Sequence, residues 1–281
     1  MRRARAVRIG IYQLCKTCTQ PKTCFVLLLL LLYAVIFAAP VADFAQEKQR
    51  AVSALGVFPV LASAHYPQML LMMGVVLLFS DAPFWDANQK YILLRADWRA
   101  WSGGQVLYVL VTMALYLLAV NLFCWLVMLP NIVFSTDWEK IWPTLALQSF
   151  GEIDSSVAPA LIRYFSALEA WCLSMLLTWL AGCSMGLLML FVNAHTRSKA
   201  GLILAGTISL MNLTIWNSLL DTNLYYLSPV SLANLAVVDI VGGSSGYPSL
   251  QYAVIALTIV VMVLVGLNIG LAGRLATKLD N

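Results

Sequence analysis

Six long apolar stretches divide this chain, and polar or charged residues gather in the connections between them. A helix needs about 20 predominantly apolar residues to cross a bilayer, and each stretch has roughly that length. The pattern therefore predicts an all-α polytopic membrane protein. We expect one transmembrane domain over residues 1–281, with six spans at about 24–42, 60–80, 105–129, 165–193, 201–220 and 251–271. The fourth span is long, so we expect it to be tilted, to project beyond the bilayer or to contain a break.

The composition agrees with this pattern. Hydrophobic residues make up 61% of the chain and charged residues 11%, whereas soluble domains are about half apolar and about a quarter charged. The mean hydropathy is +0.84. A soluble globular protein is therefore excluded.

The distribution of basic residues predicts the orientation in the membrane, because cytoplasmic segments carry an excess of Lys and Arg. With the N-terminus in the cytoplasm, 13 of the 17 basic residues fall on the inner side. The outer four are Lys48, Arg50, Lys140 and Arg163. We therefore expect both termini in the cytoplasm, together with the polar segment 81–104.

The first 22 residues are basic, with apolar residues interspersed. They predict an amphipathic helix lying flat at the inner membrane surface; the alternative is a frayed tail whose arginines only set the topology. The basic region followed by a leucine run is also similar to a secretory signal peptide. More than twenty residues precede that run, which is long for this role, so we expect the segment to remain. Cys15, Cys18 and Cys24 lack a clear fourth ligand, so no metal site is predicted.

The polar segment 81–104 reads DAPFWDANQKYILLRADWRAWSGG and predicts a short structured helix. Its large apolar residues recur at helical spacing: Tyr91, Leu94, Trp98 and Trp101. Asp81 can cap such a helix and Pro83 fits its first turn. Asp86 and Lys90 form a favourable pair four residues apart. A connection of this kind usually contacts the lipid surface or a soluble partner.

Two outer segments differ from simple loops. Residues 130–163 contain Trp138, Trp142 and Phe150, and aromatic residues near a membrane boundary usually anchor at the headgroup level. Residues 221–250 have no Lys or Arg and are rather apolar. They predict short re-entrant helices in the outer leaflet, ended by a glycine turn.

No catalytic constellation is evident. The two histidines, His65 and His195, are expected on opposite sides of the membrane at solvated or interfacial positions, so they cannot share a metal. No zinc-protease, serine-hydrolase or phosphate-loop motif occurs. Any ATP must therefore bind to another subunit, and a membrane-embedded enzyme is disfavoured.

Polar residues within the spans are the remaining candidates for a transport pathway. Glu169 is the only acid in an apolar run; we expect it near the outer end of its span, where it reaches water or touches a cationic substrate or a partner helix. The buried-acid pattern of ion-coupled carriers is missing. Uncharged candidates, which we assign to helix packing first and to pathway lining second, are Asn121, Asn212, Asn217 and Asn268.

This layout resembles the permease subunits of type-two ATP-binding cassette exporters. The segments that carry the resemblance are FSDAPFWDANQKYILLRADWRAWSGGQVLY, LMLPNIVFSTDWEKI and YYLSPVSLANL, and the order of elements covers essentially the whole chain. The resemblance implies a bacterial cytoplasmic (inner) membrane protein that pairs with a second permease subunit and with two cytoplasmic ATPase subunits. ATP and Mg²⁺ would be held by those ATPases, with no cofactor in this chain, and nucleic acid is not an expected partner.

The resemblance also assigns segment 81–104 as the coupling helix that seats in a groove of the ATPase. The residues implicated are Asp81, Pro83, Phe84, Trp85, Tyr91, Arg95, Trp98 and Arg99. Phe84, Trp85 and Tyr91 would anchor the contact, and the two arginines would pair with acids or lipid phosphates. Spans two and five would face the second permease.

The sparse charge in the spans favours an amphipathic or lipid-like cargo, such as a lipid, an antimicrobial peptide or a hydrophobic drug. Two alternatives stay open. One is a stand-alone ion-coupled carrier or channel, and the other is a regulatory membrane subunit that binds an ATPase without transporting.

Overall fold

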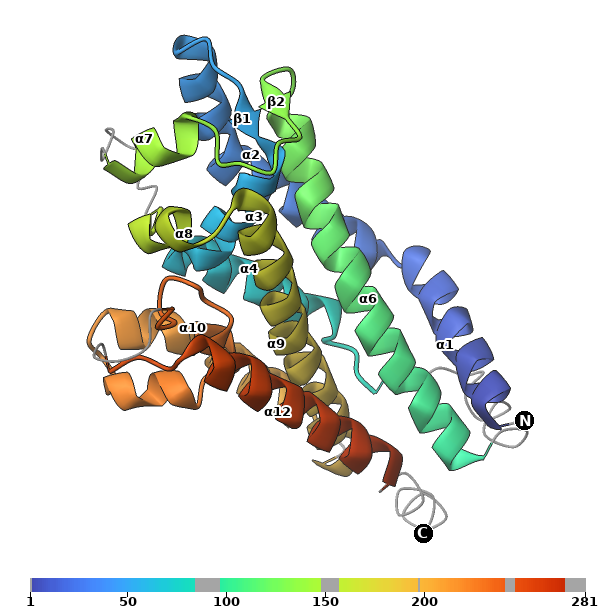
Figure 1. Cartoon of the computed structure of the whole chain (residues 1–281). Helices are drawn as coiled ribbons and strands as arrows, with labels where there is room; N and C mark the ends of the chain where they lie inside the picture. The colour runs from blue at the N-terminus through green and yellow to red at the C-terminus, as the bar shows by residue number, and fades with distance from the viewer. Residues whose placement is uncertain (1, 84–96, 148–156, 197, 241–245, 271–281) are drawn as a thin grey trace.

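The computed structural model describes residues 2–83, 97–147, 157–196, 198–240 and 246–270, and it is mostly helical (Figure 1). Its extended structure is limited, within those residues, to one two-stranded parallel ladder and one isolated bridge. The elements are α1 (Arg2–Cys18), α2 (Pro21–Glu47), β1 (Val52–Ser53), α3 (Ala54–Ser63), α4 (His65–Leu78), α6 (Trp98–Val127), β2 (Ile132–Val133), α7 (Ile141–Leu147), α8 (Pro159–Tyr164), α9 (Ala167–Thr196), α10 (Ala200–Trp216), η1 (Thr222–Tyr226), α11 (Pro229–Leu232) and α12 (Leu250–Gly270).

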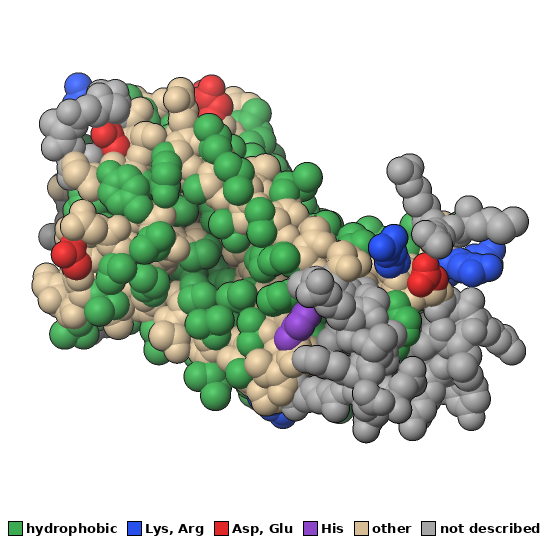
Figure 2. Space-filling view, turned by 90° about the horizontal axis from the view of Figure 1, so that it is seen from below, with side chains coloured by type: hydrophobic (Ala, Val, Ile, Leu, Met, Phe, Trp, Pro, Cys, Tyr) green, Lys and Arg blue, Asp and Glu red, His purple; other side chains and the backbone are tan. Residues whose placement is uncertain are grey.

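Four of these helices, α2, α6, α9 and α12, are long and apolar enough to cross a membrane. Large apolar side chains are exposed along their outer faces, among them Leu28, Leu118 and Met262. Figure 2 shows hydrophobic side chains across the middle of one face, with charged groups toward its two ends. The chain is therefore a multi-pass, all-α membrane protein, as predicted. The predicted fifth span corresponds to α10, a shorter apolar helix of 17 residues.

Helices α6 and α9 form an antiparallel pair at the centre. Near one end, the indole N–H of Trp171 donates to Oδ1 of Asn121 at 2.9 Å. Further along, Trp179 Nε1 donates to the carbonyl of Leu110 at 3.0 Å. Helix α9 is one continuous 30-residue helix, so the break considered for the fourth span is not there.

The break lies instead in the second span, where α3 and α4 meet at an angle of 89° around Ala64. Pro67 follows three residues later; it has no N–H to donate to the Ser63 carbonyl and its ring would clash with that carbonyl in a continuous helix, so α3 cannot continue smoothly. The carbonyl of Ala54 accepts a bond from Trp125, near the C-terminal end of α6. The carbonyl of Ala82 accepts one from Asn193, near the C-terminal end of α9. Because α6 and α9 are antiparallel, the bent pair runs from one end of the bundle to the other.

Helix α1 packs along the first half of α6 (Figure 1). A Cβ atom on Gly104 would lie 2.7 Å from Cγ2 of Ile9, so the absence of a side chain there allows close approach. Helix α6 begins at Trp98 and continues through Gly103 and Gly104, so it starts before residue 105, where the third span was predicted to begin. The N-terminal helix itself is confirmed, while its location at lipid headgroups stays a prediction.

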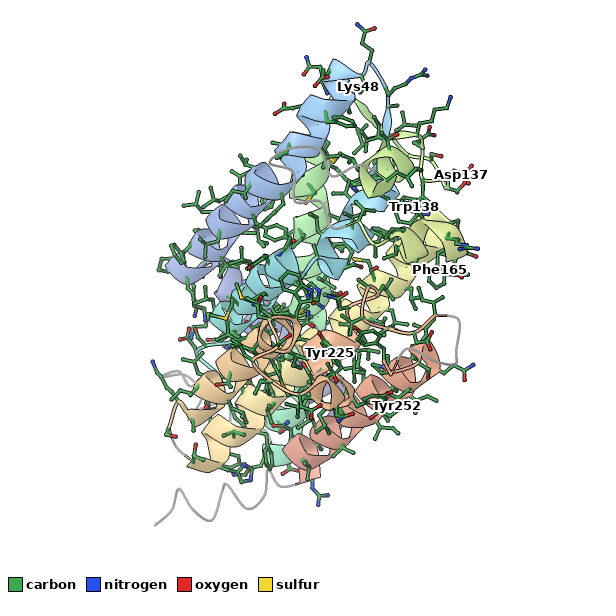
Figure 3. The ribbon with its side chains drawn as sticks, turned by 90° about the vertical axis from the view of Figure 1, so that its left-hand side faces the viewer. Lys48, Asp137, Trp138, Phe165, Tyr225 and Tyr252 are labelled. Atoms are coloured by element: carbon green, nitrogen blue, oxygen red, sulfur yellow. The ribbon has the colours of Figure 1, made fainter. Side chains whose placement is uncertain are left out.

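The tryptophans of the predicted outer loop are buried rather than anchored in headgroups. Trp142 is 1% exposed and Trp138 6% exposed. Trp142 Nε1 donates to the carbonyl of Ser53 at 3.2 Å, and Trp138 Nε1 donates to that of Phe165 at 2.7 Å (Figure 3). Their aromatic surface therefore closes the end of the core over α3 and α9. Phe150 lies outside the described residues.

Candidate functional site

The predicted coupling segment is described at its two stems only. Phe84, Trp85, Tyr91 and Arg95 lie outside the described residues. In the first stem, residues 80–83 form turns rather than the start of a described helix. Lys22 Nζ lies 2.5 Å from Oδ2 of Asp81. The Asp81 carboxylate therefore forms an ion pair with the start of α2, and its expected capping role stays untested. Pro83 is half-buried in the same turn.

The second stem begins at Asp97 and enters α6. Trp101 is 2% exposed and packs with Ile9 of α1, while Trp98 is half-buried against them. The two indole rings meet edge to face with centroids 5.9 Å apart. Arg99 is exposed. Trp98 and Trp101 thus attach this stem to the N-terminal helix.

Asn193 connects the first stem to the rest of the bundle, and sequence reasoning missed it. Its amide nitrogen donates to the carbonyl of Ala82 at 3.0 Å. Its Oδ1 accepts from the backbone N–H of Gly201 at 2.7 Å. One buried side chain therefore joins α9, α10 and the turn before residue 84. The only signal in the sequence was a polar residue near the end of an apolar span.

A second polar site lies at the break between α3 and α4. Gln68 is fully buried, and its amide nitrogen donates to the carbonyl of Val230 at 2.7 Å. Its Oε1 accepts from Asn212 at 2.6 Å and from Asn234 at 2.9 Å. The bonds link α4 to α10, to α11 and to the segment after α11. Of these amides, sequence reasoning selected only Asn212. Gln68 lies within the second predicted span and Asn234 within the outer segment 221–250, and neither was singled out.

His65 belongs to the same site and is half-buried, whereas the sequence predicted a solvated or interfacial residue. Its ring stacks on Trp216 with centroids 4.7 Å apart. Its Nδ1 lies 3.3 Å from the amide nitrogen of Asn212. An amide nitrogen only donates, so Nδ1 is the acceptor and carries no proton in this arrangement.

The other predicted polar residues lie apart from this site. Asn121 joins α6 to α9 through Trp171. Asn268 donates to Leu187 of α9, and its carbonyl accepts from Ser102 of α6 at 2.8 Å. Asn217 is exposed at the end of α10. These contacts fit the packing roles assigned first to Asn121 and Asn268.

Glu169 forms a capping box at the start of α9. Its Oε2 accepts from the backbone N–H of Ser166 at 2.8 Å, and Ser166 Oγ in turn accepts from the N–H of Glu169 at 3.3 Å. This reciprocal pair satisfies two N–H groups at the helix start. Glu169 is exposed at this end.

No group of three or more His, Cys, Asp or Glu side chains in the described part of the chain is placed to hold a metal ion. Cys15, Cys18 and Cys24 are exposed thiols around the junction of α1 and α2.

No protein-family model, curated protein or solved structure matches this chain.

Proposed function

We propose that this chain is a permease subunit of an ATP-binding cassette exporter in the bacterial cytoplasmic membrane. Two cytoplasmic ATPase subunits would supply ATP and Mg²⁺, and a second permease would complete the pathway. The six spans would be α2, the bent pair α3–α4, α6, α9, α10 and α12. Both termini would lie in the cytoplasm.

The observation that carries the proposal is the gathering of several segments at one end of the bundle. The start of α1, the turn at 80–83, the start of α6, the junction of α9 with α10 and the end of α12 lie together there (Figure 1). The described basic residues at this end include Arg5, Arg8, Arg99 and Lys199. By the positive-inside rule, these residues support assigning this end to the cytoplasm.

The stems provide the route by which an ATPase would act on the spans. Movement of the segment between them would pull directly on Asp81 and Ala82, and through Asn193 on α9 and α10. The second stem would move with α1 through Trp101 and Ile9. ATP binding would then favour one arrangement of the spans because the ATPase contacts differ between the two states.

The segment between α10 and α12 fits the re-entrant helices predicted for residues 221–250. Ser228 Oγ accepts from the N–H of Ser231 and caps α11, whose core-facing residues are buried. Tyr225 and Tyr252 lie well inside the bundle's length, far from Lys48 and Asp137 at its outer end (Figure 3). Irregular backbone at membrane depth is tolerated where protein covers it, so this segment would form a re-entrant plug.

A second candidate, an ion-coupled carrier that works alone, is favoured by the broken span and its amide site. Secondary transporters often bind substrate where a discontinuous helix exposes backbone groups near mid-membrane. The described side chains that form hydrogen bonds at this break are uncharged, which makes coupling to a cation less favourable there.

The test is a mild-detergent pull-down of the chain from its native membrane, with the bound proteins identified. We expect an ATP-binding cassette ATPase to be recovered. A Phe84→Ala/Trp85→Ala double variant should lose the ATPase or uncouple its hydrolysis from transport while still inserting. Phe134→Ala, at an exposed position on the opposite end, is the matched control.

Recovery of the chain alone and intact would contradict the proposal and favour the carrier. Transport by the purified chain in liposomes without ATP would do the same. An ATPase that binds without any transport would identify a regulatory subunit instead.

A further inference from the structure

Five buried side-chain oxygens have no hydrogen-bond partner among the described residues near the break in the second span. They come from four elements: Ser63 of α3, Ser174 and Thr178 of α9, Asn212 of α10 and Ser231 of α11. Each of these residues is at most 2% exposed. A buried polar atom without a partner is costly, so such atoms are uncommon and call for an explanation.

The four elements meet around the same bonds. Ser63 stands two residues before His65, which lies within reach of the Asn212 amide. Ser231 follows Val230, whose carbonyl accepts from Gln68, and Gln68 in turn bonds Asn212. Helix α9 packs against α3, α10 and α11. We call this set of five oxygens the polar layer.

An apolar groove of about 250 Å³ adjoins the polar layer on its cytoplasmic side. It lies between α9, α10, α11 and α12, and its lining includes Met185, Ile208, Pro229, Val260 and Val263. On α9, Ser174, Thr178 and Met185 stand at positions i, i+4 and i+11, so they share one face of the helix.

Helix α10 also connects the groove to the polar layer. On α10, Asn212 lies one turn beyond Ile208. Helix α10 is antiparallel to α9, as the Gly201 to Asn193 bond shows. Toward the polar layer, residue numbers therefore fall along α9 and rise along α10. Pro229 and Ser231 connect the two regions on α11 in the same way.

We propose that the groove and the polar layer form one binding site for a neutral single-chain amphiphile. The hydrocarbon chain would lie in the groove, and hydroxyl or amide groups of its head would bond the oxygens of the layer. The proposal rests on the proposed function, since it names the class of cargo, but binding itself requires no ATPase.

Charge decides which head group fits. The residues of the polar layer and the side chains that bond the Asn212 amide nitrogen are uncharged, and an ionised phosphate or carboxylate buried there would lack a counter-charge among the described residues. The groove volume is below the range of about 300–1,000 Å³ usual for small-molecule pockets, which suits one chain better than a bulky ring system.

The test uses the purified chain in phosphatidylcholine nanodiscs, with a monoacylglycerol that carries a photoreactive diazirine in its chain. The matched probe is the same molecule with a phosphate on the glycerol. We expect the neutral probe to label residues of the groove and the phosphorylated probe to label them far less. Unlabelled monoacylglycerol should compete.

The variant Thr178→Val/Ser231→Ala removes two oxygens that bond none of the described residues, so its thermal stability should be unchanged or higher. Its labelling by the neutral probe should fall about tenfold, at about threefold for each lost hydrogen bond. Ser209→Ala is the control, because the Ser209 hydroxyl already bonds the Ala205 carbonyl within its own helix.

Equal labelling by both probes, or labelling that the double variant leaves unchanged, would overturn the proposal and leave a groove filled by any lipid. A double variant that loses stability but keeps its labelling would also overturn it and assign the oxygens a structural role. Failure to recover an ATPase in the pull-down would refute the exporter assignment without affecting these outcomes.

Discussion

The amide nitrogen of Asn212 donates a 2.6 Å hydrogen bond to Oε1 of Gln68, joining α10 to α4 just after the break in the second span. The two residues are 144 positions apart in the chain. Gln68 also bonds Asn234 and the carbonyl of Val230. A single side chain thus holds three segments around the bend.

Gln68→Leu should therefore lower the free energy of unfolding by about 1–3 kcal/mol, since it leaves several buried polar groups without partners. Denaturant unfolding in micelles would measure the loss. Ser209→Ala, which removes only a bond within one helix, should have a much smaller effect. Equal losses in the two variants would show that the amide site does not hold the bend.

Gly104→Ala should disturb the packing of α1 on α6. The new Cβ would lie 2.8 Å from Cβ of Ile9 and 3.0 Å from the carbonyl oxygen of Ala6. Overpacking of this kind costs about 1–3 kcal/mol. Trypsin should then cut α1 faster at Arg8 and Lys16. Gly103→Ala is the control, because its Cβ would meet only Ala6 at 3.5 Å; equal cutting of both variants would argue against the close contact.

Gly56→Ala should destabilise the end of the bundle at which α3 begins. A Cβ at this position would lie 2.4 Å from Nε1 of Trp142, which is buried and bonded to Ser53. We expect a loss of about 1–3 kcal/mol from overpacking, seen as a lower unfolding temperature. Gly206→Ala, where the new Cβ meets nothing within 4 Å, should instead be neutral or gain up to about 1 kcal/mol from helix propensity. The opposite order would show that Trp142 can move aside.

Charge reversal tests the stem pair. Lys22→Glu or Asp81→Lys should weaken coupling to the proposed ATPase partner, because each places like charges together at the first stem. The pair is partly exposed, so each change should alter stability by no more than about 1 kcal/mol. The double exchange should restore cargo-stimulated ATP hydrolysis. If either single variant couples normally, or if the double exchange does not restore hydrolysis, the Lys22–Asp81 pair has no role in coupling.

Thiol labelling tests the orientation. In a variant whose exposed cysteines are serine except Cys15, a membrane-impermeant maleimide should react only when the cytoplasmic face is accessible. A matched variant with Ser135→Cys as its exposed cysteine should react only from the opposite face, because Ser135 lies beside Ser53 at the other end. Reaction of both variants from one face would contradict the proposed topology.

The length of the apolar runs predicted both ends of α9 and α12, the start of α2 and the end of α6 to within a few residues. The end of α2 and the start of α6 lie further from the predicted positions. The agreement arises because a run of about 20 apolar residues is a local property that the bilayer alone selects. The third span was predicted to start at residue 105 because the polar segment ends at Gly104. The helix instead begins at Trp98, and the missing side chain of Gly104 makes room for α1.

The tertiary structure alone decided how the polar residues meet. Gln68, Asn212 and Asn234 come from distant parts of the chain, and their bonds depend on how three elements cross at the break. Likewise, Trp138 and Trp142 are buried because the outer segments fold over α3, which no local pattern specifies. Hydropathy fixes which segments leave water, whereas side-chain hydrogen bonds depend on relative positions that only packing determines.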